Sequence, residues 1–192
     1  MERSPDVTWQ TGRVTRDGRG SKGATVWFTG LPSSGKSSIA YAVEERLVRS
    51  GRPAYVIDGD NLRHGLNGDL GFSAEDRSEN IRRAAAVAAL FADAGVVALV
   101  SLVSPFIADR QQARRAHEQA ELPFAEVWVS TPPEECERRD PKGLWARARA
   151  GEITGFTGVD DPYEQPPSPD LTLGPELAVE AAAEQVLAWI SR

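Results

Sequence analysis

The chain has 192 residues, 41% of them hydrophobic, which is enough for the core of one α/β domain. Its net charge of −6 argues against a general nucleic-acid-binding protein, because such proteins usually carry a basic surface. A single cysteine, Cys136, excludes an intrachain disulfide, and we find neither a secretion signal nor an apolar run of membrane-spanning length. We therefore expect a cytoplasmic protein with no nucleic-acid partner and no membrane partner.

Residues 1–22 are polar and contain several glycines and arginines, so we expect an N-terminal arm ahead of a domain at 23–192. Trp9 is a candidate anchor for this arm. Both a solvated tail and a docked segment are compatible with its composition.

The next segment predicts a phosphate-binding loop. An apolar, β-rich run at 24–29 leads into Gly30–Ser37, which fits G-x-x-x-x-G-K-[ST], and a helical pattern then continues to about Ser50. In this context main-chain N–H groups and the helix N-terminus bind phosphates. We expect Lys36 to reach the β- and γ-phosphates of a nucleotide and the Ser37 hydroxyl to ligate Mg²⁺. A glycine-rich turn without a ligand is the alternative.

A short buried strand at 54–57 runs directly into Asp58–Arg63, which carries two carboxylates, an amide and a guanidinium. At the end of a strand, Asp60 can orient an attacking hydroxyl and accept its proton. Arg63 suits an anionic group on the acceptor, because its planar fork matches oxyanion geometry. A polar turn with an Asx-type hydrogen bond is the alternative.

The helical pattern at 75–94 places Arg77, Asn80 and Ile81 on one face, where an anion and a flat base can bind together. Phe72 is a candidate stacking surface for that base. Taken alone, these residues favour ordinary roles as a surface arginine and core side chains.

The second half of the chain predicts three further strands and more helices. We expect strands at 96–103, 125–129 and 171–173, helices at 106–119 and 176–190, short helices within 133–150, and a loop or lid at 151–170. Strands that alternate with helices indicate a mostly parallel α/β sheet, which binds ligands beyond the carboxyl ends of its strands. The basic run at 138–142 is either an exposed charged stretch or a set of cations that closes over phosphates.

Together these segments resemble the adenylylsulfate kinase (APS kinase) family over about residues 8–175. The resemblance rests on Gly30–Ser37, Asp58–Asn67, Asp69–Ser73, Asp76–Arg83, Ser104–Phe106, Arg139–Gly143 and Gly155–Tyr163. It implies a three-layer α/β/α P-loop kinase fold with a five-stranded sheet and a small lid at about 140–160. It also implies a homodimer that transfers the γ-phosphate of ATP to the ribose 3′-hydroxyl of adenosine 5′-phosphosulfate, giving PAPS and ADP in sulfate assimilation.

The resemblance implies roles for individual residues. The ATP-binding set is Gly30, Leu31, Pro32, Ser33, Ser34, Gly35, Lys36, Ser37, Ser38 and Arg138. The set for adenylylsulfate is Asp60, Asn61, Leu62, Arg63, Phe72, Arg77, Ser78, Glu79, Asn80, Ile81, Val103, Ser104, Lys142, Gly155 and Phe156. The catalytic set is Lys36, Asp60, Lys142 and Ser104. The family marks the Ser104 position as a phosphoserine intermediate, but in-line transfer needs no covalent carrier, so we expect Ser104 to contact substrate.

The chain departs from the family pattern at a few positions. Residues 32–34 read Pro-Ser-Ser where many members have Ser-Gly-Ser-like residues, Ser38 replaces a frequent Thr, and Gln10 replaces a frequent His. No sulfurylase-like domain is present, so we expect a stand-alone kinase. Two alternatives stay open, namely a P-loop kinase of another small hydroxyl compound and a nucleotide-binding regulatory protein.

Overall fold

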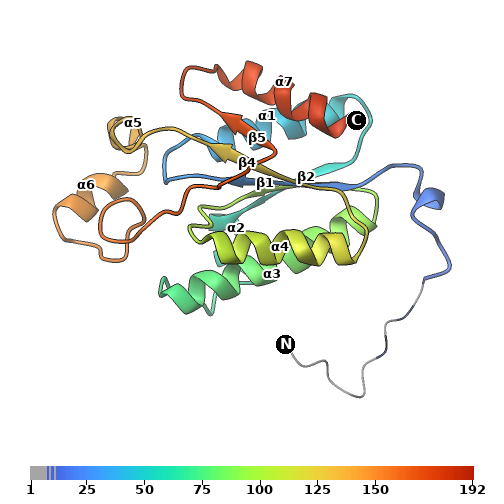
Figure 1. The fold of residues 1–192 in the computed structure, drawn as a ribbon, viewed down its shortest axis with the longest axis horizontal. Helices are drawn as coiled ribbons and strands as arrows, with labels where there is room; N and C mark the ends of the chain where they lie inside the picture. Colours follow the sequence, from blue (N-terminus) through green and yellow to red (C-terminus); the bar gives the residue numbers. More distant parts are fainter. Residues whose placement is uncertain (1–7, 9, 11) are drawn as a thin grey trace.

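The structure is a computed structural model that describes residues 8, 10 and 12–192 (Figure 1). The strands are β1 (Ala24–Thr29), β2 (Ala54–Asp58), β3 (Val97–Ser101), β4 (Phe124–Val129) and β5 (Leu171–Leu173). The helices are the 3-10 turn η1 (Asp17–Arg19), α1 (Lys36–Arg49), α2 (Gly59–Arg63), α3 (Ala74–Asp93), α4 (Ile107–Gln119), α5 (Pro133–Arg139), α6 (Leu144–Arg149) and α7 (Val179–Ile190).

The five strands form one sheet in the order β2-β3-β1-β4-β5, and every pair is parallel. Helices α1 and α7 cover one face and α3 and α4 cover the other, so the predicted three-layer α/β/α fold is confirmed (Figure 1). The central strands β1 and β3 are buried throughout, as expected for strands that are covered on both faces.

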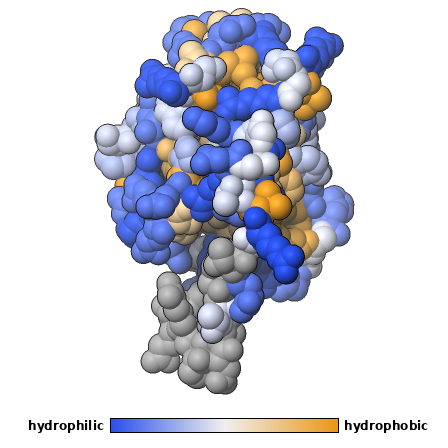
Figure 2. Space-filling view, turned by 90° about the vertical axis from the view of Figure 1, so that its right-hand side faces the viewer, coloured by the Kyte–Doolittle hydropathy of each residue, from blue (hydrophilic) through white to orange (hydrophobic). Residues whose placement is uncertain are grey.

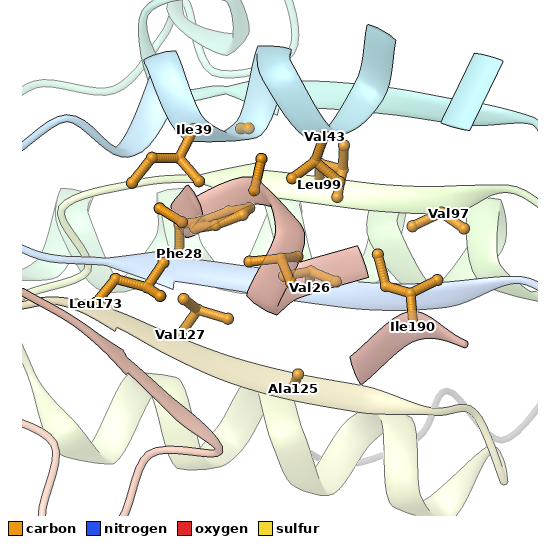
Figure 3. Close-up of a cluster of buried hydrophobic side chains, with 14 of the residues drawn as sticks. Val26, Phe28, Ile39, Val43, Val97, Leu99, Ala125, Val127, Leu173 and Ile190 are labelled. Carbon is orange, nitrogen blue, oxygen red and sulfur yellow. The ribbon is translucent and has the colours of Figure 1, made fainter. Parts of the chain in front are cut away.

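Alternation along β1 divides the core between the two faces of the sheet. Val26 and Phe28 lie in the cluster beneath α1 and α7, together with Val43 and Ile190 (Figure 3). Trp27 lies on the opposite face in the cluster covered by α3 and α4. Since successive strand residues point to opposite faces, one apolar strand supplies both layers of the core.

The register of the sheet aligns the ends of its strands. Asp58, the last residue of β2, pairs with Ser101 of β3, and Phe28 of β1 pairs with the same residue. The segments that follow β1, β2 and β3 therefore begin at one edge of the sheet. This edge carries the residues that the sequence singled out.

Two element boundaries differ from the prediction by more than one residue. The third strand ends at Ser101 instead of residue 103, because the chain beyond it leaves the sheet and enters a turn with a positive φ at Ser104. The last helix begins at Val179 instead of residue 176, because Leu177 N–H donates to Gly174 O in a separate turn.

The described part of the predicted arm, from residue 12 onward, contacts the ends of two helices. The Arg16 guanidinium donates to Asp93 Oδ1 at 2.6 Å, to Ala120 O at 2.8 Å and to Glu121 O at 3.2 Å. These carbonyls belong to the C-terminus of α4, where a cation is favourable. Trp9, the candidate anchor, lies outside the described residues, and the domain division at residues 22/23 stays a prediction.

The face seen in Figure 2, opposite α5 and α6, is mostly hydrophilic with small scattered apolar groups. Among the described residues, none of the helices has the length and apolar content that a membrane crossing requires.

Glu121 occupies a position that favours glycine. It follows α4 with a φ of 54°, and Leu122 N–H closes the helix end on His117 O at 2.9 Å. Glu121→Gly should raise the free energy of unfolding by about 1 kcal/mol, because a left-handed backbone is unfavourable for residues with a Cβ. Chemical denaturation would measure this. The matched control Glu118→Gly, inside α4, should lower stability by a similar amount, and a destabilised Glu121→Gly variant would contradict the prediction.

Candidate active site

The loop between β1 and α1 has the conformation of a phosphate-binding nest. Gly30, Ser33 and Gly35 have φ values of 152°, 66° and 106°. The loop also contacts β4 closely, since a Cβ on Gly30 would lie 2.6 Å from Val129 O. Ser34 O accepts hydrogen bonds from Thr131 Oγ1 at 2.8 Å and from an Arg139 N–H at 3.3 Å. The loop is therefore held in place from β4 and α5.

The Lys36 ammonium is buried within this loop. It donates to Gly30 O at 2.9 Å, to Leu31 O at 2.7 Å and to Ser34 Oγ at 3.3 Å. Burial lowers the pKa of Lys36 to about 8, although the Cys136 thiol and the Asp58 carboxylate oppose this shift. The ammonium thus lies on the concave side of the loop and binds loop oxygens.

Ser37 joins the phosphate loop to the ends of β2 and β3. Its hydroxyl donates to Asp58 Oδ2 at 2.7 Å and lies 3.0 Å from Ser101 Oγ. Asp58 Oδ1 accepts from Asp60 N–H at 2.9 Å, so the Asx-type turn considered as an alternative is present beside the phosphate loop.

The oxygens around Ser37 suit a hard cation. Mg²⁺ prefers oxygen ligands and is usually bound through one or two protein groups together with phosphates. The hydroxyl of Ser37 and the carboxylate of Asp58 match this donor set. No group of three or more His, Cys, Asp or Glu side chains among the described residues has the arrangement of a self-contained metal site.

Asp60 and Lys142 form an ion pair, which joins α2 to the loop between α5 and α6. Both side chains are more than half exposed, and the hydrogen bond that Lys142 donates to Asp60 raises the pKa of Lys142. The predicted lid therefore contacts the strand-end carboxylate directly. Arg138 of α5 lies on the surface and pairs with Glu135 at 2.7 Å, while Ser38 is exposed on α1.

Two arginines flank the exposed ring of Phe72. The Arg63 guanidinium carbon lies 4.2 Å from the ring centre and that of Arg77 lies 5.9 Å away. Arg63 donates to Leu70 O and Gly71 O, at 3.1 Å and 2.8 Å. Burial, and secondarily the charge of Arg77, lower the pKa of Arg63. The structure thus brings these three predicted residues together.

Arg77 also contacts the predicted lid. It donates to Gly155 O, and its Nε lies 3.5 Å from Asp161 Oδ2. Phe156, expected to lie around a ligand, is 9% exposed and packs edge-on against Trp145 with ring centres 5.3 Å apart. Together with Leu31 these aromatics form a small core that attaches α6 to the phosphate loop.

The remaining predicted residues of α3 divide between core and surface. Ile81 is buried in the core, and Asn80 is buried with its Oδ1 accepting from Asn67 Nδ2 at 2.8 Å. Ser78 donates to Asp109 at 2.9 Å. Hydrogen bonds from Arg82 and Arg83 lower the pKa of Glu79 to about 2, so Ser78 and Glu79 are engaged in contacts within the helical layer.

Ser104 is buried, with 3% of its surface exposed and a φ of 40°. Its Oγ accepts from Trp27 Nε1 at 3.1 Å, and its carbonyl accepts from Arg110 at 2.7 Å. The hydroxyl is thus held inside the protein by the core, and Val103 beside it is half-buried. Asn61 and Leu62 lie in α2, exposed and half-buried respectively.

Several residues at this edge were absent from the predicted set. Asn67 is fully buried against Asn80, Thr131 and Arg139 hold the phosphate loop, and Asp161 pairs with Arg77. Asn67, Arg139 and Asp161 belong to runs that resemble the family, which is the sequence signal that pointed to them. Thr131 lies outside these runs, and its role depends on a contact between segments that are distant in the chain.

The family model described as adenylylsulphate kinase matches residues 22–174.

The chain belongs to the adenylylsulphate kinase family.

Relatives within this family cover most of the chain. The adenylyl-sulfate kinase of Clostridium acetobutylicum is 50% identical over 176 residues, which are 90% of this chain and 86% of that protein. The bifunctional enzyme CysN/CysC of Mycobacterium tuberculosis is 53% identical over 184 residues, 96% of this chain. The chain spans only 30% of the length of that relative.

Solved structures of the family share the fold. The M. tuberculosis APS kinase CysC, in complex with AMPPNP and APS, has a TM-score of 0.88 and 54% identity over 90% of this chain and 99% of that one. A hexameric APS kinase from Thiobacillus denitrificans has a TM-score of 0.65 and 30% identity, over 90% of this chain and 29% of that chain.

Gly30 allows the phosphate loop to pass close to β4, and Gly30→Ala tests this contact. We expect a loss of about 1–3 kcal/mol of unfolding free energy, because the backbone must move away from Val129 O. The control Gly51→Ala also has a positive φ, of 82°, but nothing lies within 4 Å of its added Cβ. Denaturant titration of both variants measures how much of the lost unfolding free energy comes from the clash with Val129 O. Equal losses of unfolding free energy in the two variants would contradict the prediction.

Proposed function

We propose that this protein transfers the γ-phosphate of ATP to the ribose 3′-hydroxyl of adenosine 5′-phosphosulfate. The observation that carries the proposal is the meeting of two sets of groups at one sheet edge. Lys36 and Ser37 of the phosphate loop lie beside Asp58, while Asp60 and Lys142 pair just beyond it. The family of the chain supports adenylylsulfate as the acceptor.

ATP would bind with its β- and γ-phosphates on the main-chain N–H groups of Gly30–Ser37. Lys36 would exchange its two carbonyl contacts for phosphate oxygens. Of the other predicted ATP residues, Ser38 lies in α1 directly after this loop and Arg138 lies in α5. An ammonium that exchanges neutral carbonyl oxygens for anionic phosphate oxygens gains interaction energy. This gain supports a phosphate-binding role for Lys36.

Adenylylsulfate would bind at the ends of β2 and α3. Arg63 and Arg77 supply positive charge for its anionic group, and Phe72 supplies an exposed ring for its base. Both arginines now donate to backbone carbonyls, so the substrate would replace neutral acceptors with charged ones.

Transfer of the γ-phosphate would depend mainly on the positions of the reacting groups and on neutralisation of the phosphate charge. Asp60 would accept the proton of the ribose hydroxyl after Lys142 moves from it toward the transferring phosphate. When bound, Mg²⁺ would neutralise charge on the phosphate oxygens, held by Ser37 with Asp58 behind it. Because the Ser104 hydroxyl is enclosed by the core, its geometry favours direct transfer over a phosphoserine.

Other features of the proposal concern the chain as a whole. We propose a single kinase domain at 23–192 with a lid at about 140–160, supported by the separate small core around Trp145. We also propose a cytoplasmic homodimer. The single cysteine supports the compartment and the sequence resemblance supports the dimer, whereas the APS kinase of Thiobacillus denitrificans is described as hexameric.

Release of ADP with and without adenylylsulfate tests the proposal. We expect fast release only when adenylylsulfate is present, and Lys36→Ala should lower it by about 10³-fold with thermal unfolding intact. Adenosine, shikimate and gluconate serve as control acceptors. ADP release that ignores adenylylsulfate, or that prefers a control acceptor, would refute the assignment.

The pKa of Lys36 predicts how ATP affinity depends on pH. The free protein loses the Lys36 proton above about pH 8, whereas bound phosphates favour the charged ammonium. ATP affinity should thus be constant below pH 8 and fall by up to about tenfold per pH unit above it. Titration calorimetry from pH 6.5 to 9.5 covers this window.

Lys36→Arg is the control, because a guanidinium stays charged throughout this range. Its affinity for ATP should be lower and independent of pH. An equal slope in both proteins would assign the titration to another group and contradict the prediction.

A further inference from the structure

Arg110 of α4 is a buried arginine that the predicted site does not include. Its side chain is 2% exposed, and each of its three guanidinium nitrogens donates to a different segment of the chain. Nε donates to Glu126 Oε1 of β4, Nη1 to Ser104 O and Nη2 to Glu164 O, each at 2.7 Å. We call Arg110 and these three partners, together with Tyr163, the Arg110 network.

One arm of the network fixes the turn after β3. Ser104 has a φ of 40°, a conformation that residues with a Cβ keep only when their surroundings impose it. Arg110 binds its carbonyl at 2.7 Å, Thr29 Oγ1 binds the same carbonyl at 3.3 Å, and Trp27 Nε1 binds its hydroxyl. The Ser104 turn, which borders the proposed adenylylsulfate site, is therefore held mainly by a charged hydrogen bond from Arg110 of α4.

The other arm fixes the end of the predicted lid. Glu164 O accepts from Arg110, Glu164 N–H donates to Pro105 O at 2.9 Å, and Glu164 Oε2 accepts from Ile107 N–H at 2.6 Å. The Tyr163 hydroxyl lies 2.9 Å from Thr29 Oγ1, and its ring centre lies 5.7 Å from the Arg110 guanidinium. The chain is thus anchored immediately after the lid.

The earlier part of the same segment contacts the candidate site. Arg77 binds Gly155 O and lies near Asp161, and these two partners precede Glu164 by nine and three residues. A change at the anchor would therefore alter the position of the backbone that Arg77 contacts. Arg110 is linked in this way to both segments that border the proposed adenylylsulfate site, while its own hydrogen bonds go to Glu126, Ser104 and Glu164 and not to the phosphate loop.

We propose that Arg110 is a positioning residue for the acceptor substrate, which sets the Ser104 turn and the fixed end of the lid at the same time. The proposal rests on the proposed function for the identity of that substrate. A purely structural role, in which the buried pair with Glu126 only stabilises the fold, is the competing explanation. The positioning role predicts that loss of Arg110 weakens the use of adenylylsulfate alone. The purely structural role predicts that ATP binding is weakened equally.

The main test is the double variant Arg110→Met/Glu126→Gln, which removes both charges and so leaves no unpaired buried ion. We expect KM for adenylylsulfate to rise about 10- to 100-fold, since small misplacements of binding groups have effects of this size. The affinity for a non-hydrolysable ATP analogue, measured by calorimetry, should stay unchanged.

Arg114→Met is the matched control. Arg114 lies one turn further along α4 and pairs with Asp170 at 2.5 Å. Asp170 hydrogen-bonds the main chain of Glu126, so this pair touches the Arg110 network only through that backbone. This variant should lose thermal stability but keep the wild-type KM for adenylylsulfate. Arg110→Lys retains the charge beside Glu126 without the planar fork, so it should recover thermal stability but little of the KM.

The result that overturns the proposal is a folded double variant with wild-type KM for adenylylsulfate, or one that loses ATP affinity equally. If the double variant does not fold, Tyr163→Phe removes one hydroxyl of the network at nearly constant shape. It should raise the same KM several-fold, at about the strength of one hydrogen bond, and an unchanged value would equally overturn the proposal.

A second readout separates this proposal from the proposed function. Hydrogen exchange of residues 155–164 does not require turnover. Exchange there should accelerate in the double variant and stay at the wild-type rate in Arg114→Met; equal rates in all three proteins would overturn the anchoring role. Wild-type protein that ignores adenylylsulfate would refute the proposed function alone.

Discussion

The parallel register of β2, β3 and β1 is the constraint on which the site depends. Because Asp58 and Phe28 both pair with Ser101, the chain leaves all three strands at the same level. The phosphate loop, the carboxylates of α2 and the Ser104 turn consequently meet at one edge. A shift of one residue in any of these strands would also move each side chain to the other face of the sheet. The buried side chains of β1 that hold the fold together therefore also fix the site.

Cations at this edge are bound to oxygens of the protein itself. Lys36 binds loop carbonyls, Lys142 binds Asp60, and Arg63 and Arg77 bind carbonyls near Phe72 and Gly155. Each of these groups would otherwise face water or a low-dielectric interior without a partner, which is costly when a charge is buried. Anionic substrates offer stronger acceptors at the same positions, so this arrangement is compatible with their entry and with a lid that closes on them.

Much of the fold and part of the site could be predicted from the sequence, because they depend on local patterns. Apolar runs and helical periodicity located all five strands and the main helices, and the glycine spacing located the phosphate loop. The contacts of Arg110, the burial of Asn67 and the packing of Phe156 against Trp145 depend on which elements become neighbours. Side-chain type alone does not determine those contacts, since a charged or aromatic residue in a loop is more often exposed.

The most direct measurement is phosphorus NMR of the products formed from ATP, Mg²⁺ and adenylylsulfate. We expect ADP together with a new phosphomonoester on the ribose 3′-oxygen of adenylylsulfate, in equal amounts. ADP accompanied by inorganic phosphate, with adenylylsulfate unchanged, would contradict it.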